Sequence, residues 1–163
     1  MTQPIYLDSI EDLQELFDGI QEDFEAINYT DYMVAELHLM AELHEGYFQR
    51  EAGPDGVAWP KNAPRTIREK GHSRILRGKP SNRYRLSRSL TERATQTVDE
   101  AVREAIQTDT GGWMTFGSLV PYGPFHDRDR GRIPARRHVG INDEHLDGMT
   151  ERAADFTLKE LAK

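Results

Sequence analysis

Apolar side chains recur at helical spacing near the start of the chain, from residue 9 to residue 27. They form one narrow stripe, and the opposite face is almost entirely Glu, Asp and Gln. The stripe consists of Ile10, Leu13, Leu16, Phe17, Ile20, Phe24 and Ile27. Ser9 stands at the position of a helix cap, and Asp12 at that of the acid in a capping box. We therefore predict an amphipathic helix whose single apolar face covers a sheet or another helix.

A second helical pattern begins at Thr30 and continues to about Arg50, and its apolar face is wider. The members of this face are Tyr32, Met33, Leu37, Leu39, Met40, Leu43, Tyr47 and Phe48. So wide a face is typical of a central helix, or of one that also meets a neighbouring subunit. His44 lies in the middle of it, which favours a hydrogen-bonded core histidine over a metal ligand.

Turn residues and basic residues dominate the next part of the chain. Gly53-Pro54-Asp55-Gly56 is a strong turn signal, because Pro fixes φ and Gly supplies positive φ. A short helix is expected near Pro64–Lys70. Residues 71–92 are rich in Arg, Lys, Ser, Gly and Pro and have few apolar anchors, so we predict a long basic loop or arm there.

The stretch from residue 94 to residue 107 fits two kinds of secondary structure. Thr97-Val98-Asp99-Glu100 matches a capping box, and apolar residues then recur at helical spacing. We predict a helix to about Ile106, but Val and Ile near its end could equally open a strand. Residues 113–120 are a clearer strand, with Met114 and Phe116 on one face.

Residues 137–141 are predicted to form a second short strand, and Asn142 or Asp143 caps a last helix. The inward face of that helix is expected to be Leu146, Met149, Ala153, Phe156 and Leu161. Together the elements indicate an α+β fold, with helices packed on a small, mainly antiparallel sheet. We expect a single domain over residues 1–163, with an acidic helical segment at 1–29 and the basic loop at 71–92.

Composition adds that the core should be thin. Only 37% of the 163 residues are hydrophobic, so a second subunit is expected to complete part of the apolar surface. The absence of cysteine excludes disulfide scaffolds, thiol catalysis and thiolate metal sites. No stretch approaches the roughly 18 apolar residues of a membrane span, and the start of the chain lacks the pattern of a secretory signal. These features lead us to expect a soluble, cytoplasmic protein without a membrane partner.

Charge is distributed in blocks along the chain. Residues 1–60 contain 14 acidic residues and one basic residue, Arg50, whereas residues 61–140 contain 17 basic and 8 acidic residues. Such blocks attract one another, within a subunit or between neighbouring subunits. A basic middle segment could also bind phosphate backbones, which keeps a small nucleic-acid-binding module as an alternative, although no aromatic–basic interleaving accompanies it.

The residues that could carry catalysis are few. His126-Asp127 is formally an HD doublet with further His and Asp residues nearby, and a metal-dependent nuclease or phosphohydrolase could use such ligands. The doublet lies in an Arg- and Gly-rich segment, however, and neither a phosphate-binding glycine motif nor a G-x-S-x-G elbow occurs. We therefore expect no enzymatic activity, no cofactor and no bound metal.

The remaining motifs occur in a recognisable order. They are Phe48; Pro54-Asp55-Gly56-Val57-Ala58-Trp59-Pro60; Thr66 to Lys70; Leu86-Ser87-Arg88-Ser89-Leu90; Phe116-Gly117-Ser118-Leu119-Val120-Pro121-Tyr122; His126; and Ile133-Pro134-Ala135-Arg136 through Gly140. This order resembles the phage virion morphogenesis family, the tail-completion proteins of tailed bacteriophages and prophages. The chain departs from the family at Arg83-Tyr84-Arg85, at the position of Gly131 and at Arg137-His138-Val139.

The resemblance implies a structural virion protein that completes the tail, or joins it to the head, as a homo-oligomeric ring in the neck. Six subunits are the expected number, and the residues themselves leave the ring size open. Its partners would be its own copies and adjoining neck or tail proteins, such as the tail tube and a head-closure or adaptor ring. DNA would pass through the lumen without sequence-specific binding, and the ring would assemble in the host cytoplasm. The residues expected to fix loops and interfaces are Phe48, Trp59, Tyr122, His126, Asp127, Pro134, Arg136 and Gly140.

Overall fold

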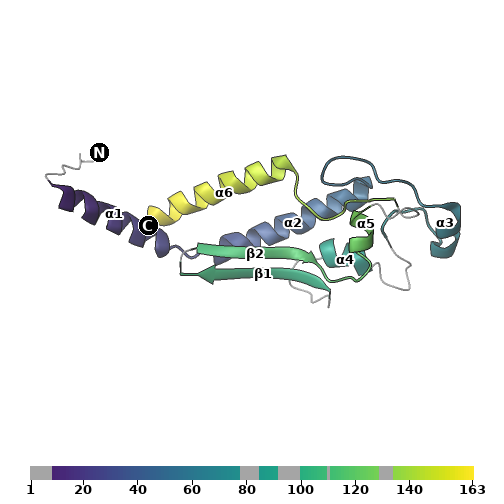
Figure 1. Cartoon of the computed structure of the whole chain (residues 1–163), viewed down its shortest axis with the longest axis horizontal. Coiled ribbons are helices and arrows are strands. Elements are labelled where there is room, and N and C mark those ends of the chain that lie inside the picture. Colours follow the sequence, from purple (N-terminus) through teal and green to yellow (C-terminus); the bar gives the residue numbers. More distant parts are fainter. Residues whose placement is uncertain (1–8, 78–84, 92–99, 110, 129–133) are drawn as a thin grey trace.

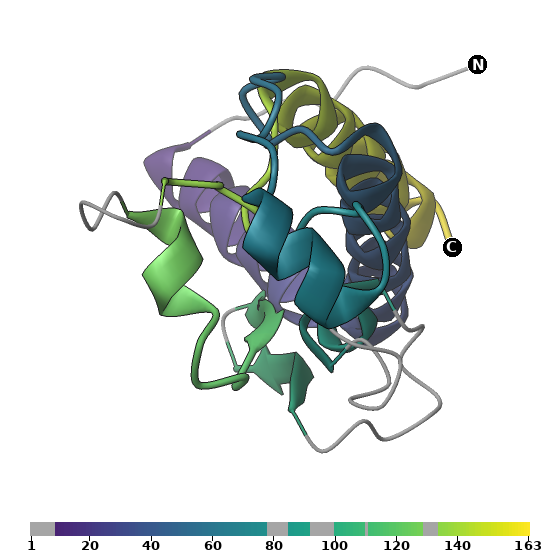
Figure 2. The same ribbon diagram turned by 90° about the vertical axis from the view of Figure 1, so that its right-hand side faces the viewer.

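The computed structural model describes residues 9–77, 85–91, 100–109, 111–128 and 134–163. The molecule is elongated, and helix α2 (Thr30–Arg50) runs along its middle, between helix α1 (Ile10–Glu25) at one end and helix α3 (Pro64–Lys70) at the other (Figure 1). A two-stranded sheet and helix α6 (Asp143–Leu161) pack against α2, and α1 projects at its end. Helix α3 and the loop before it gather at the opposite end (Figure 2). Within these ranges, helices and an antiparallel sheet make the fold α+β, which confirms the expected class.

Helix α1 begins where the sequence predicts it. Ser9 Oγ accepts a hydrogen bond from the backbone N–H of Asp12 at 3.0 Å, and the Asp12 carboxylate accepts one from the N–H of Ser9 at 3.0 Å. The capping box is therefore confirmed. The prediction that the apolar face covers another element is wrong, because none of the residues of α1 is buried.

Helix α2 supplies much of the buried core, as its wide apolar face predicts. Its buried residues are Met33, Glu36, Leu37, Ala41, His44, Tyr47 and Phe48. The helix ends at Arg50, because the next residue, Glu51, adopts a left-handed conformation with φ of 53°. One end of α2 meets the last helix, and the other enters the main apolar cluster.

The sheet pairs strand β1 (Ala101–Thr108) with strand β2 (Gly111–Ser118) in antiparallel register. The helix predicted up to Ile106 is therefore wrong over residues 101–106, and the alternative strand is correct; residues 97–99 lie outside the described residues. The β-branched residues Val102 and Ile106 pair with Gly117 and Trp113 of the next strand along the chain. This pairing favours a strand over a helix at residues 101–106. Of the strand predicted at residues 113–120, residues 113–118 are confirmed, and residues 119 and 120 lie beyond its end.

The strand predicted at residues 137–141 is also wrong, since this segment is irregular. Its backbone groups bind side chains instead of a neighbouring strand. The carbonyl of Arg137 accepts from the Trp59 indole, and the N–H of Gly140 donates to His44. Gly140 has φ of 145°, which is not a conformation of a regular strand.

Of the basic loop predicted at residues 71–92, residues 71–77 are irregular as expected, although Ile75 and Leu76 are buried. The prediction is wrong at residues 85–91, which form helix α4 (Arg85–Thr91), while residues 78–84 and 92 lie outside the described residues. Leu86 and Leu90 of α4 are almost fully buried. They join the largest apolar cluster, whose buried members are Tyr47, Phe48, Trp59, Ile75, Leu76, Leu86, Leu90 and Val120.

Helix α6 is capped by Asn142, whose side chain accepts from the N–H of His145 at 2.9 Å, as predicted. Its expected inward face is only partly correct. Met149, Ala153 and Phe156 are half-buried, whereas Leu146 and Leu161 are exposed. Within the ranges described above, no helix combines the length and the apolar composition that crossing a bilayer requires.

Candidate assembly site

Two segments that lie far apart in the sequence interlock at the end of the molecule away from α1. We call residues 53–61 and 136–140 the loop scaffold. The indole Nε1 of Trp59 donates to the carbonyl of Arg137 at 2.7 Å. In return, the Arg136 guanidinium donates to the carbonyl of Pro60 at 2.9 Å and to that of Lys61 at 3.3 Å. Arg136 thus binds a pair of backbone carbonyls, which suits its planar fork of donors.

Aromatic packing holds the loop scaffold on the core. The Trp59 ring is buried and meets Phe48 edge-on, with ring centroids 5.5 Å apart. Tyr122 packs against the same apolar cluster from the segment after β2. Phe48, Trp59, Tyr122 and Arg136 therefore belong to one connected region, although they come from four separate parts of the sequence.

Gly140 closes the scaffold at a position where any side chain would be strained. Its φ of 145° disfavours an L-residue, and a Cβ would lie 3.0 Å from Cγ of Pro54. Across the turn, the Asp55 carboxylate accepts from the N–H of Val57 at 3.0 Å. The Pro54–Gly56 turn and Gly140 therefore fit together as rigid backbone.

His44 connects α2 to this scaffold in one defined protonation state. Its Nδ1 lies 2.7 Å from the Met40 carbonyl, which can only accept, and its Nε2 accepts from the N–H of Gly140 at 3.3 Å. Acceptance by Nε2 requires a neutral imidazole, with its proton on the Nδ1 that donates to Met40. Burial, followed by the positive charge of Arg103, lowers the pKa of His44 to about 4, despite its bond to Met40. His44 is thus a hydrogen-bonded core histidine.

His126 and Asp127 lie on helix α5 (Pro124–Asp127), next to the other half of the scaffold. The carbonyl of His126 accepts from the N–H of Arg136 at 2.6 Å. Nδ1 of the buried His138 lies 3.1 Å from the Asp127 carboxylate and 3.0 Å from the Arg136 carbonyl. The doublet is therefore tied into the backbone of the scaffold.

The charge states in this region follow from burial and from these contacts. Burial, helped by His138 and Arg136, lowers the pKa of His126 to about 4. Burial opposes ionisation of Asp127, but the hydrogen bonding and charge of His138, together with His126, outweigh it and lower the pKa of the carboxyl. In the ranges that the structure describes, no group of three or more His, Asp or Glu side chains is placed to hold a metal ion. Asp129, Gly131 and Ile133 lie outside those ranges, and Pro134, the first described residue after them, is half-buried.

Sequence reasoning missed a buried ion pair between α2 and α6. Glu36 is 1% exposed, and its carboxylate accepts from Nε and from a terminal nitrogen of Arg152, at 2.5 and 2.8 Å. The sequence feature that could have indicated this pair is the position of Glu36 within the wide apolar face of α2. This bidentate pair compensates for the otherwise costly burial of a carboxylate.

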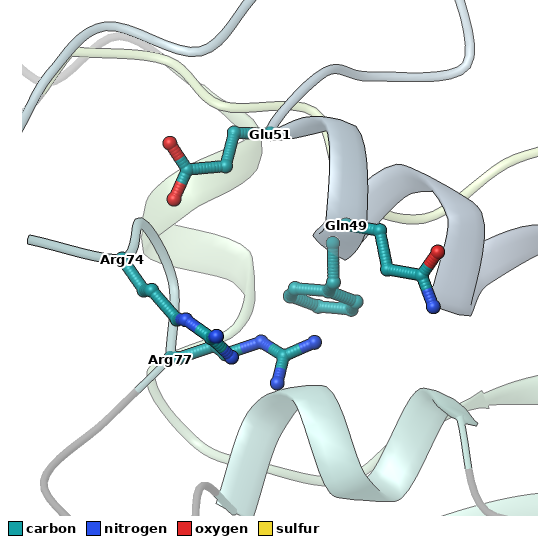
Figure 3. Close-up of a pocket in the computed structure, with 5 residues that line it drawn as sticks. Gln49, Glu51, Arg74 and Arg77 are labelled. Carbon is teal, nitrogen blue, oxygen red and sulfur yellow. The ribbon is translucent and has the colours of Figure 1, made fainter.

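A cationic pocket, also missed, opens beside the scaffold (Figure 3). Its volume is about 190 Å³, and it is lined by Phe48, Gln49, Glu51, Arg74 and Arg77. Figure 3 shows Arg74 and Arg77 reaching across it from one loop, while Gln49 and Glu51 come from the end of α2. Glu51 also accepts from the N–H of Ile75 at 2.7 Å, which fixes the loop against the helix.

The scaffold residues have internal structural roles, and the pocket is an opening beside them that side chains of another molecule can enter.

Comparisons with known proteins add no relative. No protein-family model matches the chain, and no curated protein and no solved structure matches it either.

Proposed function

We propose that this chain is a structural subunit of a tailed phage or phage-like particle. It completes the tail, or joins the tail to the head, as a homo-oligomeric ring in the neck. The observation that carries the proposal is the loop scaffold. Four residues from the motifs that resemble the phage family contact one another's segments there: Trp59, Arg136, Pro54 and Gly140. The contacting residues are 76 to 86 positions apart in the sequence. The shared motifs are thereby explained as anchors of one rigid end of a subunit.

The distribution of apolar surface supports an assembling protein. Helix α1 leaves Ile10, Phe17 and Phe24 at 79%, 60% and 46% exposure within one chain. Large exposed apolar stripes of this kind mark sites of protein–protein contact. The polar groups of His44, His138 and Arg136 are meanwhile occupied by internal contacts, as fits a structural role.

In the assembled particle, the ring would contact the tail tube on one side and a head-closure or adaptor ring on the other. DNA would pass through its lumen, where acidic side chains would repel the phosphate backbone and let it slide. The chain would be made in the host cytoplasm and would remain in the neck of the finished virion.

Native mass spectrometry and negative-stain electron microscopy of the full chain test the proposal. We expect a closed ring with a central opening, and we expect the chain in stoichiometric amount in purified particles from the cells that encode it. A chain that stays monomeric at high concentration and hydrolyses phosphodiesters with added Mn²⁺ would overturn the proposal. In that case His126→Ala and Asp127→Ala should abolish the hydrolysis.

A further inference from the structure

The apolar stripe of α1 is the largest unpaired apolar feature among the described helices. We use this name for Ile10, Leu13, Phe17, Ile20 and Phe24, which are all more than a third exposed. Their spacing places them on one face, and an open groove of about 340 Å³ runs beside Leu13 and Phe17. Among the described elements, α1 contacts chiefly the end of α6, and most of the helix projects away from the other described elements (Figure 1).

The charge of α1 argues against pairing with a second α1. Its 16 residues include seven acids, Glu11, Asp12, Glu15, Asp18, Glu22, Asp23 and Glu25, and no Lys or Arg. Two such helices side by side would bring together two segments that each carry seven negative charges, and like charges repel. The partner of α1 must therefore present basic groups.

The opposite end of the same molecule presents them. Residues 61–77 contain six bases, Lys61, Arg65, Arg68, Lys70, Arg74 and Arg77, and a single acid, Glu69. Arg74 and Arg77 line the cationic pocket together with the buried ring of Phe48. Nε of Arg77 is buried there and has no hydrogen-bond partner within the described part of the chain. A buried donor without a partner is costly, and an incoming carboxylate would satisfy it.

We infer that α1 of one subunit docks on residues 61–77 and the cationic pocket of the next subunit. Contact with the neighbour covers the apolar stripe, and an acid at its edge, Asp18, which lines the groove with Leu13 and Phe17, pairs with Arg74 or Arg77.

Because α1 and helix α3, which belongs to residues 61–77, lie at opposite ends of the elongated subunit, the contact is head-to-tail (Figure 1). A head-to-tail contact generates a ring when its rotation closes. The inference deepens the proposed function by naming the surfaces that join the subunits, and it rests on that proposal for closure into a ring.

Two variants of the full chain separate the two halves of the contact. Phe17→Glu damages the stripe at an exposed position, and the double variant Arg74→Glu with Arg77→Glu damages the pocket. We expect each variant alone to need at least tenfold more protein for half-assembly in sedimentation velocity. The control Arg128→Glu reverses the charge of an exposed arginine outside residues 61–77 and outside the pocket, and it should assemble like the wild type.

Mixing the two defective variants gives the decisive result. One intact stripe then meets one intact pocket, so the mixture should form a 1:1 dimer and stop there. The inference is overturned if the mixture stays monomeric, if the pocket variant assembles normally, or if the wild type does not self-associate.

Particle analysis tells failure of this contact from failure of the proposed function. A dimer in the mixture, with the chain absent from purified particles, would support the contact and reject the virion role. The chain found in particles, with Phe17→Glu still assembling normally, would reject the contact and keep the role.

Discussion

Arg136 and its neighbour Arg137 offer a direct test of the loop scaffold. The two residues are adjacent and chemically identical, but Arg136 is 7% exposed and binds two carbonyls, whereas the Arg137 side chain is exposed. Replacing each by Ala therefore removes the same atoms from two different environments. Arg137→Ala keeps the backbone carbonyl that accepts from Trp59.

The expected cost of Arg136→Ala follows from what the side chain contacts. The 2.9 Å bond to Pro60 comes from a charged donor and contributes about 1.5 kcal/mol, the 3.3 Å bond to Lys61 contributes less, and the buried methylenes add about 1 to 2 kcal/mol. Water can reach both freed carbonyls, since Pro60 and Lys61 are exposed, so we reduce the sum. We expect a loss of about 2.5 kcal/mol, and a Tm lower by roughly 5 to 10 °C.

Urea unfolding followed by circular dichroism measures this loss, and the emission of the buried Trp59 reports release of the loop. Arg137→Ala should remain within about 0.5 kcal/mol of the wild type, as for most exposed substitutions. Equal effects of the two variants, or no effect of Arg136→Ala, would refute the reasoning that the carbonyl clamp stabilises this end of the fold.

Three further predictions concern other parts of the structure. The folded state favours neutral His44, because its pKa is about 4 there, against an ordinary value near 6.5. The free energy of unfolding should therefore fall as the pH drops below about 6.5. The loss should be about 2 kcal/mol at pH 5 and complete near pH 4. Urea titrations at pH 8 and pH 5 should show a smaller fall in His44→Asn, and an unchanged fall would contradict this origin. Gly140→Ala should cost about 1 to 3 kcal/mol in thermal unfolding, since its φ is positive and Pro54 is close, whereas Gly19→Ala on α1 should not destabilise. Far-ultraviolet ellipticity should decrease when the wild type is diluted below its assembly concentration and stay constant for Phe17→Glu; equal dilution curves would show that α1 forms independently of the contact.

The parts of the fold that sequence predicted correctly depend on interactions between near neighbours. The capping box of Ser9 and Asp12, the cap at Asn142 and the period of α2 each involve residues within a few positions. The helix predicted to Ile106 failed because the apolar spacing within residues 101–106 does not reveal their pairing with β2, the next strand along the chain. The spacing and the pairing favoured different structures there, and the pairing decided the outcome.

The sequence allowed some residues of the candidate site to be predicted, but not the groups that these residues contact. The sequence identified Trp59 and Arg136 as anchors, yet Arg136 finds its carbonyls 75 and 76 positions away. The burial of Leu86 and Leu90 was not predicted, because most residues around them in 71–92 are basic or polar. Such neighbours make the apolar pattern hard to recognise, but they do not change which face of the helix is buried. Such contacts depend on the tertiary arrangement, which no residue spacing encodes.

The marginal stability of α1 links its folding to its contact. An isolated helix of 16 residues is marginal in water, and α1 buries none of its residues against its own chain. Its capping box stabilises the first turn, but Glu22, Asp23 and Glu25 lie at the C-terminal end, where the helix dipole disfavours negative charge. A basic surface on a neighbouring subunit would offset this repulsion and cover the apolar stripe in the same step. Helix formation and docking should therefore stabilise each other, so a stripe that is costly to expose in the free subunit becomes a source of affinity in the assembly.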